Sequence, residues 1–143
     1  MTTPPPTGVP TVLSGLGGLA HIGIRVHDLE RSAAFYARLG FQFVAGPIGL
    51  EPVAILSHPS GLELNLILNA PTATAANVLM DGPDKPAGLT HFALLCNDLD
   101  TAIKELRAVG LEPSAGPVDF GGQARGLFLR DPDRNVIELH QRL

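Results

Sequence analysis

The chain of 143 residues is 45% hydrophobic, which is enough for one globular domain or for two small halves that share a core. Its net charge of −4, without any run of Lys or Arg, argues against a nucleic-acid-binding surface. Cys96 is the only cysteine, so an internal disulfide is excluded and a reducing, cytoplasmic location is expected.

The first 17 residues, MTTPPPTGVPTVLSGLG, are rich in Pro and Gly and follow neither a helical nor a strand period. They contain neither the basic start nor the continuous apolar run of a secretory signal. No later apolar run reaches the ~20 residues that cross a membrane, so we expect no membrane contact. We therefore predict a mobile arm over residues 1–17.

Residues 18–69 predict a first module of one strand, one helix and three further strands. The stretch LAHIGIRVHDLERSAAFYARLGF combines an apolar strand with a helix that Asp28 is suited to cap and Gly40 is suited to end. Three short strand-like runs follow, FQFVA, PVAILSH and LELNLIL, and the turn sequence HPSG precedes the last of them. This order predicts a βαβββ unit.

Residues 70–87 are long for a connector, and they either cover a cavity or simply link two halves. Residues 88–143 then repeat the pattern of the first module. The stretch LTHFALLCNDLDTAIKELRAVGL predicts a strand and a helix, and the runs PSAGPV, ARGLFLR and VIELHQ predict three strands, the last one after the turn sequence DPDRN. The predicted fold class is therefore α+β, with two tandem βαβββ modules.

The two modules coincide at a constant offset of 70 residues. The coinciding pairs are Leu19/Leu89, His21/His91, Asp28/Asp98, Leu29/Leu99 and Gly40/Gly110. Histidine accounts for 5 of 143 residues, so chance would place a histidine opposite His91 only about once in thirty. Each histidine by itself is better explained as a core residue whose polar atoms a neighbouring carbonyl satisfies. The pair indicates a site that both modules share.

Two glutamates also occur inside apolar runs of the final strands, Glu63 in GLELNLI and Glu138 in VIELH. A carboxylate there is costly unless it is protonated, paired or bound to a cation, or unless it lies on the solvent face of an edge strand. Together with His21 and His91, the glutamates offer two imidazoles and two carboxylates. Such a set suits a divalent ion such as Zn, Ni, Fe(II), Mn or Co.

The remaining histidines, His27, His58 and His140, have no histidine at the matching position of the other module. His140 shares a strand face with Glu138 and is expected beside the site. The chain contains no GxSxG, Walker, strand-linked GxGxxG or CxxC motif, so other common site chemistries are disfavoured.

These segments resemble the vicinal oxygen chelate superfamily, which includes glyoxalase I, methylmalonyl-CoA epimerase, fosfomycin resistance proteins, bleomycin-binding proteins and extradiol dioxygenases. The similarity covers residues 19–140, through HIGIRVHDLERSAAFYARLGF, HFALLCNDLDTAIKELRAVG, AGPVDFGGQ and DPDRNVIEL in the family order. The resemblance implies two modules that form an incomplete barrel around a metal ion.

Among these relatives, the order His, Glu, His, Glu is most similar to glyoxalase I. An epimerase would typically have Gln in place of Glu63, and a dioxygenase would need only His21, His91 and Glu138. The resemblance implies a lyase or isomerase whose substrate, a small α-oxo or hydroxy compound, binds the metal through adjacent oxygens. Glu138 and Glu63 would then move the proton.

The resemblance also implies two substrate-binding residues, with departures from the glyoxalase I pattern. Arg25 matches an arginine that helps to hold the γ-glutamyl carboxylate of glutathione. An Asn is expected four residues beyond Glu63, but Ile67 stands there and Asn65 lies two residues beyond instead. Arg134 replaces the usual Gly of the DPDG turn. A glutathione substrate therefore stays open.

Three further questions stay open at the level of the sequence. An Fe(II) extradiol-type dioxygenase and a non-catalytic protein that binds an antibiotic or another small molecule are the alternative functions. The ligands come either from one chain or from the modules of two. We expect a homodimer, because incomplete barrels leave sheet edges and apolar faces for a second copy to cover.

Overall fold

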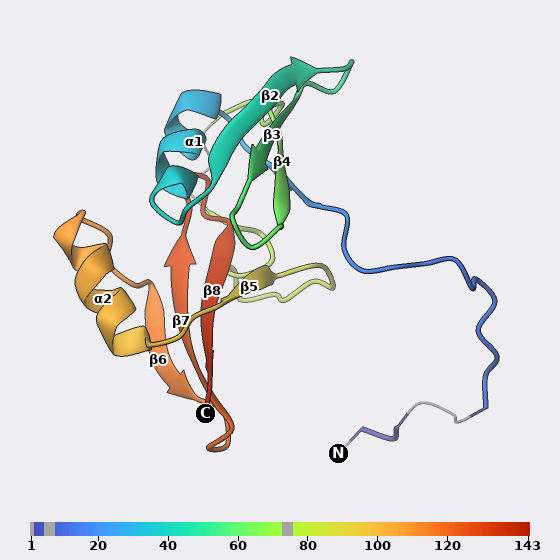
Figure 1. Ribbon diagram of the computed structural model, residues 1–143, viewed down its shortest axis with the longest axis vertical. Helices are drawn as coiled ribbons and strands as arrows, with labels where there is room; N and C mark the ends of the chain where they lie inside the picture. The colour runs from blue at the N-terminus through green and yellow to red at the C-terminus, as the bar shows by residue number, and fades with distance from the viewer. Residues whose placement is uncertain (1, 5–7, 73–75) are drawn as a thin grey trace.

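The computed structural model describes residues 2–4, 8–72 and 76–143, and it confirms two tandem modules of one α-helix and four strands each (Figure 1). The elements of the first module are β1 (Ile22–Arg25), α1 (Leu29–Ala37), β2 (Gln42–Ile48), β3 (Val53–Ser57) and β4 (Glu63–Ile67). Those of the second are β5 (His91–Leu95), α2 (Leu99–Ala108), β6 (Ala115–Asp119), β7 (Ala124–Arg130) and β8 (Val136–Arg142).

Each module folds into its own four-stranded mixed sheet. The strand order is β1-β4-β3-β2 in the first module and β5-β8-β7-β6 in the second, so the two sheets share one topology. In each sheet the strand before the helix pairs in parallel with the last strand, and the other pairs are antiparallel. That these sheets enclose a metal site remains a prediction.

The predicted helix signals are confirmed in both modules. Asp28 accepts a hydrogen bond from the backbone N–H of Glu30, and Asp98 accepts one from that of Asp100, which satisfies N–H groups that the first helical turn leaves without a partner. Just beyond the two helices, Gly40 and Gly110 adopt φ values of 97° and 78°, a left-handed conformation that favours glycine.

Alternation along the strands separates a core face from a second face in each sheet. The core face packs against the helix and contains fully buried side chains such as Leu64, Leu66, Leu127 and Ile137. The face turned away from the helix is called the open face below. On the first sheet it carries Val53, Ile55, Asn65 and Ile67, and on the second it carries Gly126, Phe128, Glu138 and His140.

The modules contact each other through α1 and the turn between β7 and β8. The hydroxyl of Tyr36 donates to Asp131 at 2.7 Å, and the guanidinium of Arg31 donates to Asp133 at 2.9 Å. Burial raises the pKa of Asp131 despite the hydrogen bonds that it accepts from Asn135 and Tyr36, and burial beside Asp131 raises the pKa of Tyr36 well above its usual value. This contact joins the helix side of the first module to the second and leaves the open faces of both sheets uninvolved.

The predicted arm and connector contain no helix or strand in their described parts. Residues 8–17 of the arm run away from both modules (Figure 1). Residues 1 and 5–7 of the arm and residues 73–75 of the connector lie outside the described residues. In the described part of the chain, no helix has the length and the apolar character that crossing a membrane requires.

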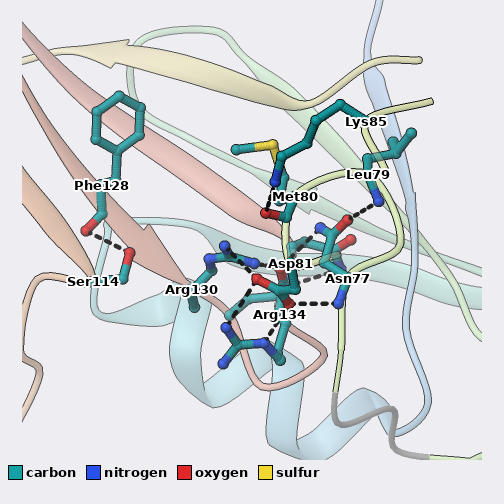
Figure 2. A network of polar contacts seen from close by, with 11 residues as sticks. Asn77, Leu79, Met80, Asp81, Lys85, Ser114, Phe128, Arg130 and Arg134 are labelled. Carbon is teal, nitrogen blue, oxygen red and sulfur yellow. Dashed lines mark hydrogen bonds and ion pairs between the residues drawn. The ribbon is translucent and has the colours of Figure 1, made fainter. Parts of the chain in front are cut away.

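The carboxylate of Asp81 binds the connector to the second module. Asp81 accepts hydrogen bonds from Arg130 Nη2 and Arg134 Nε, each at 2.8 Å, and from the backbone N–H of Asn77 at 2.6 Å (Figure 2). Asn77 and Leu79, just before this clamp, help to line a cavity of about 460 Å³. The connector therefore forms one wall of a cavity as well as linking the modules.

Candidate functional site

Glu138 lies in the middle of β8, on the open face of the second sheet. Its neighbours Ile137 and Leu139 pack into the core beneath α2, so the pleat of the strand turns Glu138 the other way. Its side chain is nevertheless only 8% exposed, because adjacent strands and side chains surround it. A carboxylate with so little exposure needs compensating partners.

Two imidazoles provide those partners. His140 Nδ1 forms a hydrogen bond of 2.7 Å with Glu138 Oε2, and His91 Nε2 lies 3.6 Å from Glu138 Oε1. The other ring nitrogen of His91 is 2.8 Å from the hydroxyl of Thr90. His91 is therefore not a core histidine: its side chain is 35% exposed and its ring faces a carboxylate.

Aromatic rings surround this group. The ring of Phe128 meets that of His91 edge-on, with centroids 5.8 Å apart, and the ring of Phe120 stacks on that of His140, with centroids 6.1 Å apart. The sequence interpretation placed His140 beside the site but missed both phenylalanines. Alternation along β7 was the available signal for Phe128, whereas no local pattern pointed to Phe120.

Strand register shows that Glu63 and Glu138 do not occupy matching positions of the two modules. In the first sheet Ile22 pairs with Leu64, and in the second Phe92 pairs with Ile137. Ile22 and Phe92 are matching positions at the offset of 70, so Leu64 matches Ile137. One residue further along each strand, Asn65 therefore matches Glu138. Glu63 thus lies two residues before the position that matches Glu138.

The physical reason is a longer hairpin in the second module. Ile48 pairs with Val53 across four intervening residues, 49–52, whereas Val118 pairs with Gly126 across seven, 119–125. The three additional residues raise the offset between matching positions from 70 to 73 for the last two strands of each module. A constant offset therefore fails beyond this hairpin.

The first module presents its polar groups on the same kind of face. Glu63 begins β4, is half-buried and shares the open face with Asn65. Asn65 Oδ1 is buried and has no hydrogen-bond partner in the described part of the chain. His21 directly precedes β1 and is exposed.

Arg25, at the end of β1, and His91 line the cavity of about 460 Å³ beside the connector. Arg25 Nε donates to Asn69 Oδ1 at 2.7 Å. Of the predicted residues, the structure thus brings His91 to Glu138 and places Arg25 on a cavity shared with His91. Across the described ranges, no three His, Cys, Asp or Glu side chains form a group that could hold a metal ion. The four-ligand set remains a prediction.

Residues 18–139 match the family model of the glyoxalase/bleomycin resistance protein/dioxygenase superfamily. No curated protein sequence matches the chain. Several solved structures match the chain over nearly their whole lengths. Their sequence identities are low, so this similarity shows a shared fold and nothing more specific.

A glyoxalase/dioxygenase from Nostoc punctiforme has a TM-score of 0.72 and 22% identity, with 94% of this chain and 99% of that chain covered. The fosfomycin resistance protein FosX from Listeria monocytogenes has a TM-score of 0.64 and 20% identity, with 90% and 95% covered. The antibiotic binding protein TnmS3 from Streptomyces sp. CB03234 has a TM-score of 0.67 and 22% identity, with 90% and 98% covered.

Proposed function

The chain belongs to the glyoxalase/bleomycin resistance protein/dioxygenase superfamily, and on that premise we propose that it is a metal-dependent lyase or isomerase of the glyoxalase type. Its substrate is a small α-oxo or hydroxy compound that binds through two adjacent oxygens. One observation carries the proposal: a nearly buried carboxylate, that of Glu138, lies between the imidazoles of His140 and His91 on the open face of a sheet.

The donor chemistry of the open faces fits a divalent ion such as Zn, Ni, Fe(II), Mn or Co. His21, Glu63, His91 and Glu138 would hold it. The buried and unpartnered Oδ1 of Asn65 is a further oxygen donor, at the position that matches Glu138. When bound, the ion would supply Lewis-acid polarisation of the two substrate oxygens.

The protein's own groups account for the movement of the proton. One oxygen of Glu138 is held by His140 at 2.7 Å, which fixes the plane of the carboxylate, and the other oxygen faces His91. This second oxygen accepts the proton from the substrate carbon and returns it to the neighbouring carbon. His140 positions the base, and Glu63 is the carboxylate that the first module adds, two residues before the position that matches Glu138.

A second copy of the chain completes the proposed site. Within one chain, the contact between α1 and the turn after β7 leaves the open face of each sheet uncovered. In the proposed homodimer, the open face of a first module lies against the open face of a partner's second module. His21 and Glu63 then reach His91 and Glu138 from across the interface.

Metal analysis of protein purified without chelator, followed by a hemithioacetal isomerisation assay, tests the proposal. We expect one divalent ion per pair of facing modules and activity that chelation removes and metal restores. Separate E63A and N65A variants identify the oxygen donor of the first module by their metal affinity. Protein that binds no divalent metal under any reconstitution would contradict the proposal and favour a metal-free protein that binds a small molecule.

Strand register specifically supports one of the alternative functions, that of a dioxygenase. Because Asn65 rather than a glutamate matches Glu138, the matching positions of the two modules supply two histidines and one carboxylate, the set that an Fe(II) extradiol-type dioxygenase needs. Oxygen consumption with Fe(II) and a catechol distinguishes this alternative from an isomerase.

A further inference from the structure

The two open faces differ where Glu138 lies. Strand pairing defines a block of four side chains on each face: Val53 pairs with Ile67 and Ile55 with Asn65 in the first sheet, and Gly126 pairs with His140 and Phe128 with Glu138 in the second. The three aliphatic side chains of the first block are thus replaced by a glycine, a phenylalanine and a histidine. Modules that share a fold have no structural need for such a difference, so it points to a specialised surface.

The longer hairpin of the second module adds Phe120 to this surface. The hairpin turns back sharply: Gly121 and Gly122 have φ values of 64° and 74°, and Asp119 Oδ1 accepts a hydrogen bond of 2.7 Å from the backbone N–H of Gly122. Phe120 is held by its backbone N–H, which donates to the carbonyl of Ala124 at 2.8 Å. Its ring is thereby directed back over the sheet.

Gly126 makes room for that ring. A Cβ atom at this position would lie 2.6 Å from Cε2 of Phe120, so the ring would have to shift, and 3.5 Å from the carboxyl carbon of Glu138. The matching residue in the first module is Val53, so the space for the ring is particular to the second module. Phe120 and Gly126 therefore form a matched pair beside Glu138.

The ring of Phe120 is left partly uncovered. It stacks on His140 with an interplanar angle of 15°, and the residue is 40% exposed, whereas the side chain of Glu138 is 8% exposed. The partly exposed ring thus lies beside the nearly buried carboxylate, because both are close to the same position at Gly126. Phe128, edge-on to His91, provides a second ring next to the same carboxylate.

We propose that Phe120, Phe128 and Gly126 form a subsite for an aromatic ring, so that the ligand is an aryl compound with two adjacent oxygens. The oxygens lie at Glu138 and His91, and the ring stacks on Phe120, because aromatic pairs favour offset-stacked and edge-on contacts. This inference rests on the proposed function for the place of the oxygens. The preference for a ring rests on the hairpin alone.

Two neutral α-hydroxy ketones, 2-hydroxyacetophenone and hydroxyacetone, provide the test because they differ only in a phenyl or a methyl group. Calorimetric titration of full-length protein, with and without bound metal, gives the ratio of their dissociation constants. We expect the wild type to bind the phenyl compound about tenfold more tightly. The F120A variant is expected to reduce this ratio to about two.

G126A and F43A are the matched variants. G126A keeps the phenylalanine but displaces its ring, so it is expected to lower the ratio as F120A does. Phe43 is also a phenylalanine on an exposed strand, 53% exposed in β2 of the first module, and F43A is expected to leave the ratio unchanged. Melting temperatures confirm that each variant is folded.

The outcomes separate this inference from the proposed function. Equal binding of the two ketones by the wild type, or a ratio that F120A leaves unchanged, overturns the aromatic subsite even if the protein binds metal. A phenyl preference that depends on Phe120 supports the subsite, and if it occurs in protein that never binds metal, the proposed function fails while the subsite stands.

Discussion

Single residues on the open faces decide the chemistry that the molecule can perform. Glu138 is the clearest case, because burying a carboxylate inside an apolar strand lowers the free energy of unfolding. Stability alone therefore does not explain a glutamate at this position. His140 and His91 offset part of this cost by contacting its two oxygens. His58 shows the opposite type of histidine, with Nε2 3.1 Å from the carbonyl of Leu39 and Nδ1 3.1 Å from the backbone nitrogen of Ser60.

The first prediction concerns Glu138 as a base. In E138Q the amide keeps one oxygen donor but cannot accept a proton. We expect bound metal to persist at least partly while hemithioacetal turnover falls by a factor of about 10² or more. Metal stoichiometry and turnover are measured on the same sample. Activity close to that of the wild type would show that another group moves the proton.

The second prediction contrasts His91 with His58. H91A is expected to lower bound metal severely and to leave the melting temperature nearly unchanged, because the ring is partly exposed and the surrounding strands are independently apolar. H58A is expected to leave metal content unchanged and to lower the free energy of unfolding by about 1–3 kcal/mol, because two backbone groups lose their partner. Metal analysis and thermal melts of both variants check this. The reverse pattern would identify His91 as a structural residue.

At the scale of elements, loop lengths and local clamps set which side chains meet. Three additional residues in the hairpin between β6 and β7 shift the match between the modules, so that Asn65 rather than Glu63 stands opposite Glu138 in the repeat. The connector offers a second example, since Asp81 joins it to Arg130 at the end of β7 and to Arg134 in the turn that follows.

The third prediction concerns this connector and pH. Hydrogen bonds from Arg134 and Asn77 hold the pKa of Asp81 well below its ordinary value of 3.8. The stability that the ionised carboxylate contributes is therefore fully present above that value, and it is lost as the pH falls below 3.8 toward the lower folded-state pKa. The D81N variant lacks this contribution at every pH.

Melting temperatures of wild type and D81N are measured between pH 7 and pH 2.5. We expect the wild type to melt higher by a constant margin at neutral pH and the margin to shrink below pH 3.8. D84N, a change of an exposed aspartate on the same connector, is expected to behave like the wild type. A margin for D81N that does not vary with pH would contradict the clamp.

At the scale of the whole molecule, each of the two similar sheets has an open face that takes no part in the contact between the modules. The modules contact through α1 and the turn between β7 and β8, and each sheet also ends in an exposed edge strand, β2 or β6. Uncovered faces and edges of this kind favour pairing with a second copy.

The fourth prediction is therefore a homodimer. Light scattering at micromolar concentration is expected to give about 30 kDa, twice the chain mass of 15.0 kDa. Mixing equal amounts of metal-poor H21A and metal-poor H91A is expected to recover about a quarter of the wild-type metal content after random exchange of subunits. Half of the dimers are then mixed, and in a mixed dimer one of the two proposed sites receives both histidines. A monomer at this concentration, or no recovery on mixing, would count against a site shared between copies.

The sequence by itself was sufficient for every feature that depends on nearby residues. The capping aspartates, the glycines that follow the helices and the alternation of Leu64, Asn65 and Leu66 are local patterns, so they predicted two modules and the faces of their strands. The pairing of His21 with His91 was also available, because no insertion lies between the start of each module and its helix.

Only the tertiary structure decided how distant segments align. Which residue matches Glu138 depends on strand pairing after a hairpin whose length differs between the modules, and the apolar runs alone fit either alignment. The ring of Phe120 over Gly126 and the carboxylate of Asp81 between two arginines join segments that no sequence period relates. These contacts form because folding brings the segments together, and they determine what surrounds the candidate site.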